Sequence, residues 1–263
     1  MNDEYNLKQI RKRIIDIGHS VGKSGAHFGS SLSLVEIIYS IYSLFKSIDH
    51  RNDRFILSKG HGALGLYAVL EHFDLMDKHT IEQFEVNGSG VFAHASKCSI
   101  NNIEFSGGSL GLGLPFAIGI ALSNMRKLND NKVFVLLGDG ECDEGIIWES
   151  LMFAAHTELS NLIVIVDNNK FQSDGEKAKI LQNNNFFNKF SSFGFDTVEV
   201  DGHDISDITN SILSLGSLDS NAPKAIIANT IKGKGVSFME QTSDWHHGFL
   251  SDLLYRQAIE ELS

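Results

Sequence analysis

Val133-Phe-Val-Leu-Leu-Gly-Asp-Gly-Glu141 is an apolar run that ends in small and acidic residues, and Leu162-Ile-Val-Ile-Val-Asp-Asn-Asn169 repeats this pattern further along the chain. Runs rich in Val, Ile and Leu are typical of strands buried on both faces of a parallel sheet. Between them, Gly145 to His156 carries apolar residues at helical spacing. The unit predicts strand, helix, strand, with both strand ends at the sheet edge where open α/β sheets bind ligands.

The two strand ends supply hard oxygen ligands. Asp139 follows the first strand and Asn169 the second, and neither is a soft ligand for zinc. Mg²⁺ prefers oxygen, takes only a few ligands from protein and leaves the rest to phosphate and water. Gly138 and Gly140 let a phosphate approach the backbone, and the next helix offers free amide donors. The pair predicts a metal and diphosphate site, although an isolated Gly-Asp-Gly would indicate only a turn.

This motif resembles that of a known family. Gly138-Asp139-Gly140 followed by Asn169, with Glu144, Gly145 and Glu149 between, is similar to the thiamine diphosphate motif of the transketolases. The resemblance implies a three-layer α/β fold with a mostly parallel central sheet and helices on both faces.

The resemblance also implies ligands for the cofactor. Mg²⁺, or Ca²⁺ or Mn²⁺ in its place, would be held by Asp139, Asn169 and the backbone carbonyl of Phe171, with Gly138, Gly140 and Glu141 beside thiamine diphosphate. Glu144 and Glu149 would belong to a carboxylate chain between paired active sites. The alternative for these two acids is ordinary solvated helix surface.

Composition limits the classes of partner. The chain has 263 residues and a formal net charge of −11, and no basic cluster offsets that charge, so no nucleic acid is expected. No apolar run reaches membrane-spanning length, so no membrane is expected either. Cys98 and Cys142 lack metal-ligand spacing, and two cysteines in a chain of this length indicate a reducing compartment. We expect a cytoplasmic protein.

Further elements follow from periodicity and turn residues. Amphipathic or apolar helices are predicted from Leu7 to Gly18, Leu32 to Phe45, Ala63 to Phe73 and Pro115 to Leu128. Strands are predicted at 54–58, 195–200 and 224–228. No repeat, proline-rich linker or domain boundary is evident, so residues 1–263 are expected to form a single diphosphate-binding domain.

Two loops before the central motif each carry a histidine. Gly22-Lys-Ser-Gly-Ala-His27 suggests a phosphate-binding P-loop, but Ile17 stands where that motif needs its first glycine, and no strand precedes it. The stretch resembles the first histidine loop of the transketolases, which implies that His27 contacts substrate or the reactive ring of the cofactor. Ser58-Lys-Gly-His61-Gly resembles their second histidine, which implies that His61 donates to the diphosphate; a helix-capping loop is the alternative.

A third histidine precedes a glycine-rich loop. Gly111-Leu-Gly113 suggests a dinucleotide fingerprint, but Phe116 occupies the third glycine position. Gly108, Ser109, Leu110 and Gly111 instead resemble the transketolase loop that lies against the aminopyrimidine, with His94 upstream as a substrate contact. Ala93-His94-Ala95 stands where the family has Gly-His-Pro, and Gly107 where it often has Thr. These departures bear on the substrate more than on the cofactor.

The last quarter of the chain carries two histidine motifs. Asp201-Gly-His-Asp204 is similar to a family motif, and His203 and Asp204 are expected to cap the following helix. Trp245-His-His-Gly248 resembles the terminal loop, whose histidine contacts cofactor and substrate. His247, followed by glycine, is the better match, and His246 is the alternative.

The resemblance covers only the N-terminal, diphosphate-binding part of a transketolase. A glutamate of the pyrimidine-binding module protonates the cofactor ring in that family, and no segment of this chain resembles that module. This implies a separately encoded C-terminal subunit, with homodimerisation through it and two copies of each chain. The activity implied is transfer of a two-carbon ketol unit from a ketose, expected to be phosphorylated, to an aldehyde.

Two alternatives remain at this point. The Ser-Gly-Ala-His27-Phe28 loop is also similar to that of deoxyxylulose phosphate synthase, which uses pyruvate as donor. The chain could also be a non-catalytic thiamine diphosphate-binding partner protein that has kept the fold.

Overall fold

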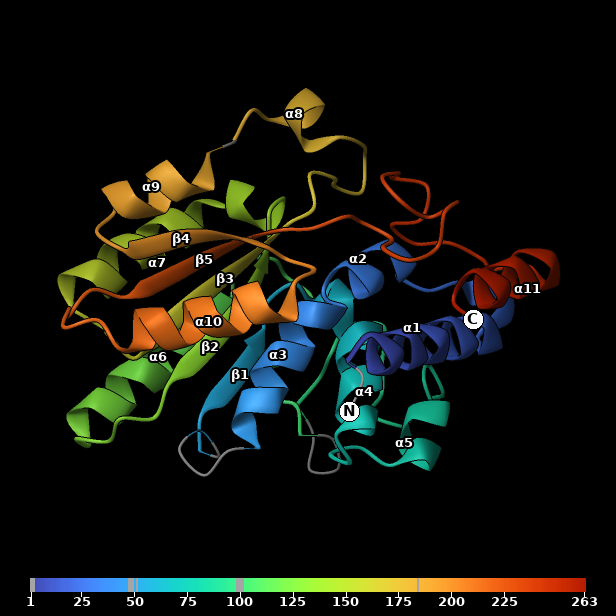
Figure 1. Ribbon diagram of the computed structural model, residues 1–263, viewed down its shortest axis with the longest axis horizontal. Helices are drawn as coiled ribbons and strands as arrows, with labels where there is room; N and C mark the ends of the chain where they lie inside the picture. Colours follow the sequence, from blue (N-terminus) through green and yellow to red (C-terminus); the bar gives the residue numbers. More distant parts are fainter. Residues whose placement is uncertain (1–2, 47–49, 51, 98–101, 184) are drawn as a thin grey trace.

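The central element of the molecule is a five-stranded parallel sheet with strand order β1-β2-β3-β5-β4 (Figure 1). The computed structural model describes residues 3–46, 50, 52–97, 102–183 and 185–263. The strands are β1 (Arg54–Leu57), β2 (Val133–Gly138), β3 (Leu162–Asn168), β4 (Asp196–Asp201) and β5 (Lys224–Asn229). The prediction of an α/β fold with a parallel sheet is confirmed.

Helices and short turns connect the strands. The α-helices are α1 (Asp3–Ser20), α2 (Phe28–Ser33), α3 (Val35–Phe45), α4 (Ala63–His72), α5 (Lys78–Glu82), α6 (Gly113–Arg126), α7 (Gly145–His156), α8 (Lys177–Ile180), α9 (Phe186–Ser192), α10 (Ile205–Gly216) and α11 (Asp252–Glu261). In the described part of the chain, none of these helices is both long and apolar enough to cross a membrane.

Two apolar clusters, one on each face of the sheet, make the three layers. Phe134, Leu136 and Ile226 face a cluster that includes α1, α3, α4 and α10. Val135 and Val164 face the opposite cluster, built with α6, α7 and α9. Figure 1 shows α3 and α10 in front of the sheet and α6 and α7 behind it. Burial on both faces is the physical reason why β2 and β3 are unbroken apolar runs.

The structure corrects one predicted helix. The stretch predicted as a single helix from Leu32 to Phe45 is divided into α2 and α3, with Leu34 between them. The hydroxyl of Ser33 donates to the carbonyl of Ser30 at 3.2 Å and to Asp167 at 2.7 Å. Serine hydrogen bonds of this kind compete with regular helix hydrogen bonds, which explains the break.

Cys98 lies outside the described residues, and Cys142 is buried.

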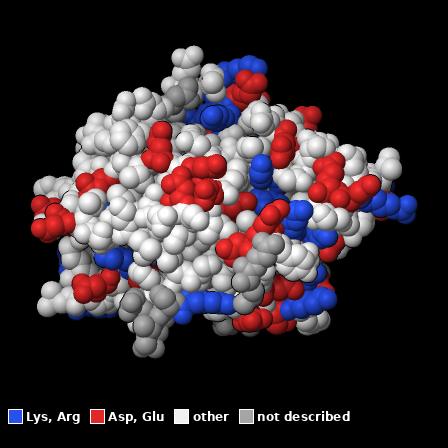
Figure 2. Space-filling model, viewed as in Figure 1, with Lys and Arg blue, Asp and Glu red and all other residues white. Residues whose placement is uncertain are grey.

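Charge on the surface is mixed. On the face drawn in Figure 2, Lys and Arg side chains form small separate groups among Asp and Glu. This distribution agrees with the negative net charge of the sequence and offers no extended basic surface on that face.

Candidate active site

A cavity of about 240 Å³ opens at the carboxyl ends of the strands. Parallel pairing puts the residues after β1, β2, β3 and β5 at the same edge of the sheet, so segments far apart in sequence meet there. We name two groups of side chains at this cavity. The strand-end cluster comprises Lys59, Asp139, Asp167, Asn169 and Lys232, and the histidine cluster comprises His27, His61, His94, His246 and His247.

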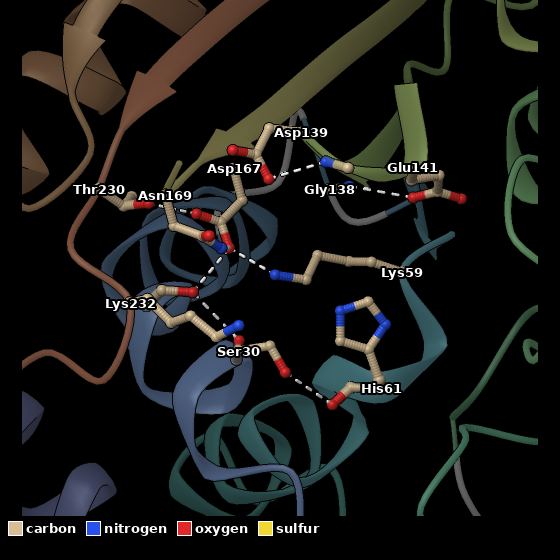
Figure 3. A network of polar contacts seen from close by, with 12 residues as sticks. Ser30, Lys59, His61, Gly138, Asp139, Glu141, Asp167, Asn169, Thr230 and Lys232 are labelled. Carbon is tan, nitrogen blue, oxygen red and sulfur yellow. Dashed lines mark hydrogen bonds and ion pairs between the residues drawn. The ribbon is translucent and has the colours of Figure 1, made fainter. Parts of the chain in front are cut away.

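Asp167 is the centre of the strand-end cluster (Figure 3). Its carboxylate is fully buried and accepts hydrogen bonds from Lys59 Nζ at 2.5 Å, from Asn169 Nδ2 at 3.3 Å and from the hydroxyl of Thr230. Burial raises the pKa of Asp167, but the charge and hydrogen bond of Lys59 outweigh burial and lower it. Asp167 is therefore a carboxylate whose charge is neutralised within the chain.

Asp139 lies next to Asp167 and forms no ion pair with a described residue. Its two oxygens accept backbone N–H groups of Gly140 at 2.8 Å and Lys170 at 2.6 Å. Burial, followed by the charge of Asp167, raises the pKa of Asp139 to about 6. A buried carboxylate in this state gains most from a bound cation.

Asn169 and Phe171 complete the predicted metal ligands. The side-chain oxygen of Asn169 accepts from the backbone N–H of Phe171 at 3.1 Å, and both residues line the cavity. Among the described residues, no group of three or more His, Cys, Asp or Glu side chains could hold a metal ion. The predicted donors are instead one carboxylate, one amide oxygen and one backbone carbonyl, and all three residues line the cavity. This sparse set of hard oxygens fits Mg²⁺, which takes its other ligands from phosphate and water.

Glu141 ties the surrounding loops together. Its carboxylate accepts from Ser58 Oγ at 2.5 Å, from the backbone N–H of Gly111 at 2.8 Å and from that of Gly138 at 3.0 Å. Burial raises its pKa. Glu141 lines the cavity, and its hydrogen bonds fix the relative positions of three loops.

Sequence reasoning missed two lysines of the cavity. Lys59 follows β1 and is fully buried, and Lys232 follows β5 and has an exposed fraction of 1%. Lys232 Nζ donates to the carbonyl of Gln172 at 3.1 Å and lies 3.3 Å from His246 Nδ1. Burial, and then the charge of Lys59, lowers the pKa of Lys232 to about 8. A lysine followed by glycine directly after an apolar strand was the available signal.

The histidine cluster is held by ring contacts. The ring of His27 lies 4.6 Å from that of His247, 5.2 Å from His94, 5.5 Å from His246 and 6.0 Å from His61, between centroids. Burial is the main cause that lowers the pKa of His27 to about 3 and of His246 to about 4. Neutral imidazoles can each donate and accept one hydrogen bond, which suits hydroxyl-rich ligands.

Most predicted site residues lie together, and a few lie elsewhere. The cavity is lined by His27, His61, His94, Gly108, Leu110, Gly138, Asp139, Gly140, Glu141, Asn169 and Phe171. His246 also lines it, whereas His247 is exposed and packs against His27. Ser109, Glu144 and Glu149 are exposed and are not among the residues that line this cavity.

The loop ends also differ from the predicted helix caps. Asp204 caps α10 as predicted, since its carboxylate accepts from the backbone N–H groups of Ser206 and Asp207. The prediction that His203 also caps this helix is wrong. Its ring lies between Glu36 and the backbone of Ile231, because the turn after β4 directs it toward α3 and β5.

The cavity at the strand ends carries hard oxygen donors and two lysines. Comparison of the sequence with known families identifies the class as a thiamine diphosphate-binding α/β protein. Residues 3–258 match the family model of the transketolase thiamine diphosphate binding domain. The chain belongs to the transketolase family.

Relatives of two lengths match this sequence. A subunit of the apulose-4-phosphate transketolase of Actinobacillus succinogenes is 34% identical, over 98% of this chain and 95% of the relative. The 6-deoxy-6-sulfo-D-fructose transketolase subunit SqwG of a Clostridium species is 33% identical with the same coverage. Human transketolase is 32% identical over 96% of this chain but only 41% of its own length.

Solved structures agree with the fold. Pichia stipitis transketolase in complex with sedoheptulose-7-phosphate superposes with a TM-score of 0.88 at 27% identity, over 97% of this chain and 40% of that chain. The relatives named here are transketolases, so a deoxyxylulose phosphate synthase is not favoured.

Proposed function

We propose that this chain is the thiamine diphosphate- and Mg²⁺-binding N-terminal subunit of a two-subunit transketolase. The enzyme transfers a two-carbon ketol unit from a ketose to an aldehyde. The observation that carries the proposal is the strand-end cluster, in which buried Asp139, with a raised pKa, lines the same cavity as Lys59 and Lys232. Near-complete coverage of relatives that are named as transketolase subunits supports the division into two chains.

Each end of the cavity has its own task in this proposal. Asp139, Asn169 and the carbonyl of Phe171 hold Mg²⁺. Lys232 neutralises part of the diphosphate charge, neutral His61 donates a hydrogen bond to the diphosphate, and Lys59 stays paired with Asp167. Bound thiamine diphosphate supplies the carbanion chemistry that ketol transfer needs. Gly108, Ser109 and Leu110 provide backbone groups beside its pyrimidine ring.

The histidine cluster orients the sugar. Burial lowers the pKa of His27 to about 3 and of His246 to about 4, so both are neutral at physiological pH in the absence of ligand. The rings of His94 and His247 lie against that of His27. They can therefore bind hydroxyl groups and carry protons between donor and acceptor oxygens.

The partner subunit docks on the face formed by α6 and α7. This face carries large exposed side chains, including Phe116, Met152 at 60% exposed and Phe153 at 47% exposed. Glu149 lies in a groove of the same face with Pro115, Ile118 and Phe153. Apolar patches of this kind mark interaction sites. Docking there would bring Glu144 and Glu149 into the interface, where they could join a carboxylate chain between active sites.

The assembly and the substrate class follow from the relatives. We propose two copies of each subunit, with residues 1–263 as one diphosphate-binding domain, in the reducing environment of the cytoplasm. The names of two relatives refer to a sugar phosphate and a sulfo sugar. We therefore propose a ketose with an anionic terminal group, most simply a phosphate, as donor.

Calorimetric titration tests the cofactor assignment. The purified chain is titrated with thiamine diphosphate and Mg²⁺, with and without the product of the neighbouring gene. Binding that tightens sharply with the second chain supports a site completed across an interface. A lack of binding under both conditions would overturn the assignment.

Product analysis separates the remaining functions. The two-chain complex is supplied with a ketose phosphate or with pyruvate, each with an aldehyde acceptor. Ketol transfer from the ketose phosphate is expected. Cofactor binding without turnover of either donor would instead support a non-catalytic binding protein.

A further inference from the structure

The turn after β5 determines where one cavity lysine lies. Thr230, at the start of this turn, donates its hydroxyl hydrogen to Asp167, and Lys232 extends into the cavity two residues later (Figure 3). The backbone N–H of Gly233 donates to the carbonyl of Gly29 at 2.9 Å. The backbone path from 230 to 234 therefore sets the position of the Lys232 ammonium group.

Buried Arg11 and partly buried His203, both outside the cavity, hold this turn at its two ends. His203 Nε2 accepts the backbone N–H of Ile231 at 2.8 Å. Arg11 Nε donates to the carbonyl of Lys234 at 3.0 Å. Neither His203 nor Arg11 is among the described residues that line the cavity. Their contacts with the site are therefore made through the backbone of the turn.

Glu36 joins these two side chains. Its carboxylate accepts from Arg11 Nη2 at 2.7 and 2.8 Å and lies 3.1 Å from His203 Nδ1. Because His203 Nε2 accepts from Ile231, the ring proton of the neutral imidazole must be on Nδ1, where it donates to Glu36. Burial raises the pKa of Glu36, but the hydrogen bond of His203 and the charge of Arg11 outweigh it and lower the pKa.

The same helical region also reaches the strand-end cluster directly. Ser33, which ends α2 three residues before Glu36, donates to Asp167 at 2.7 Å. Glu36 is only 3% exposed and Arg11 only 6%. Charged groups at this depth need partners with good geometry, and each of these has them.

We propose that Arg11, Glu36 and His203 form a clamp that positions the 230–234 turn and, through it, the Lys232 ammonium group for the diphosphate. This inference rests on the proposed function. His203 is a positioning residue in this scheme, since it acts on Lys232 through the amide of Ile231. Its tautomer is fixed by Glu36, and Glu36 is in turn fixed by Arg11.

Two substitutions of the same histidine separate positioning from general stability. His203→Asn can still donate to Glu36, but it is too short to accept from Ile231. His203→Gln reaches the position of Nε2 and keeps that acceptor. His19→Asn is the matched control. His19 Nε2 also pairs with a carboxylate, since it lies 3.0 Å from Asp252 Oδ1, and this pair is not part of the cavity.

The first measurement is hydrogen–deuterium exchange on the complete chain without cofactor. His203→Asn is expected to speed exchange of the 230–234 amides, whereas His203→Gln and His19→Asn leave it unchanged. Unchanged exchange in His203→Asn would overturn the clamp, and this measurement does not depend on the cofactor.

The second measurement is binding of thiamine diphosphate with Mg²⁺ to the two-chain complex. His203→Asn is expected to weaken binding about tenfold, the effect of one unsatisfied, partly buried amide, and His203→Gln less than about twofold. In a Lys232→Met background, His203→Asn should cost less than about twofold, because coupled residues are not additive. Equal losses in both backgrounds would overturn the inference. If the wild-type complex itself does not bind, the proposed function fails, and the exchange data still decide whether the clamp exists.

Discussion

Different interactions hold the side chains at the two ends of the cavity: an ion pair with hydrogen bonds at one end, and ring contacts at the other. In the strand-end cluster, Asp167 is matched by Lys59, and its oxygens also accept from Ser33, Asn169 and Thr230. In the histidine cluster the rings mainly contact one another, and the buried His27 Nδ1 finds no hydrogen-bond partner among the described residues. The contacts of Asp167 are complete within the chain, whereas the histidine cluster still offers hydrogen bonds to a ligand. Substitutions at Asp167 and its partners should therefore affect folding, and those in the histidine cluster only activity.

The largest effect is expected from Lys59→Met. It removes the cation from Asp167, which is fully buried, and breaking one partner of a buried pair costs about 3 to 5 kcal/mol. Urea unfolding of the chain without cofactor measures this loss of unfolding free energy. Adding Asp167→Asn in the same chain should restore part of it, because no uncompensated charge then remains. A loss below about 1 kcal/mol would show that the pair does not stabilise this end.

Asp139→Asn should separate binding from folding within the same cluster. The pKa of Asp139 is raised to about 6, so its charge opposes folding at neutral pH. Removal of this charge offsets the loss of one accepted backbone N–H, so the free energy of unfolding should change by less than about 1 kcal/mol. Binding of thiamine diphosphate with Mg²⁺ should weaken at least about a hundredfold, since the only charged metal ligand is lost.

Calorimetry with the partner subunit measures the change in affinity for Asp139→Asn. Asp174→Asn, an exposed acid in the loop after β3, is the matched control and should bind as the wild type does. Equal affinity for Asp139→Asn and the wild type would remove Asp139 from the metal site.

Asp139 and Asn169 of the strand-end cluster were predictable from sequence, and the reason is the sheet. Buried parallel strands need continuous apolar runs, so β2 and β3 were visible, and the predicted helix Gly145–His156 has the same bounds as α7. Parallel pairing then brings Asp139 and Asn169 together without further information. Lys59 and Lys232 were missed because they converge from β1 and β5, and strand order cannot be read from local periodicity.

The histidine cluster depends on loops, and their conformations are set by distant contacts. Sequence spacing alone could not choose between His246 and His247, since the choice depends on how the Trp245–Gly248 segment folds back on Ala26. His203 was predicted as a cap from its neighbours, but its partners Glu36 and Ile231 lie far away in sequence. Such long-range hydrogen bonds leave no periodic signal in the chain.

A smaller effect, confined to activity, is expected from the two adjacent histidines. His246 lines the cavity, whereas His247 is exposed, so His246→Ala should lower kcat/KM about tenfold or more, as for loss of a proton-transfer group. His247→Ala should lower it less than about twofold. Steady-state kinetics of the two-chain complex compares them, with urea unfolding as the check that both chains fold equally well. A larger loss for His247→Ala would make His247 the site histidine.

The smallest expected effect is the uptake of a fraction of a proton by Lys232 when the cofactor binds. Lys232 belongs to the strand-end cluster and contacts His246 of the histidine cluster. Its pKa is lowered to about 8, so at pH 8 about half of the free chains carry a neutral amine. An anionic diphosphate favours the ammonium form and raises this pKa, so binding at pH 8 should take up about half a proton through Lys232. At pH 6.5 the amine is already protonated in both states, and the uptake by Lys232 should vanish.

Calorimetry in two buffers of different ionisation enthalpy measures the protons, and Lys232→Met corrects for those taken up elsewhere. Identical proton uptake by Lys232→Met and the wild type at pH 8 would mean that the protonation of this lysine does not change when the cofactor binds, which would contradict the prediction.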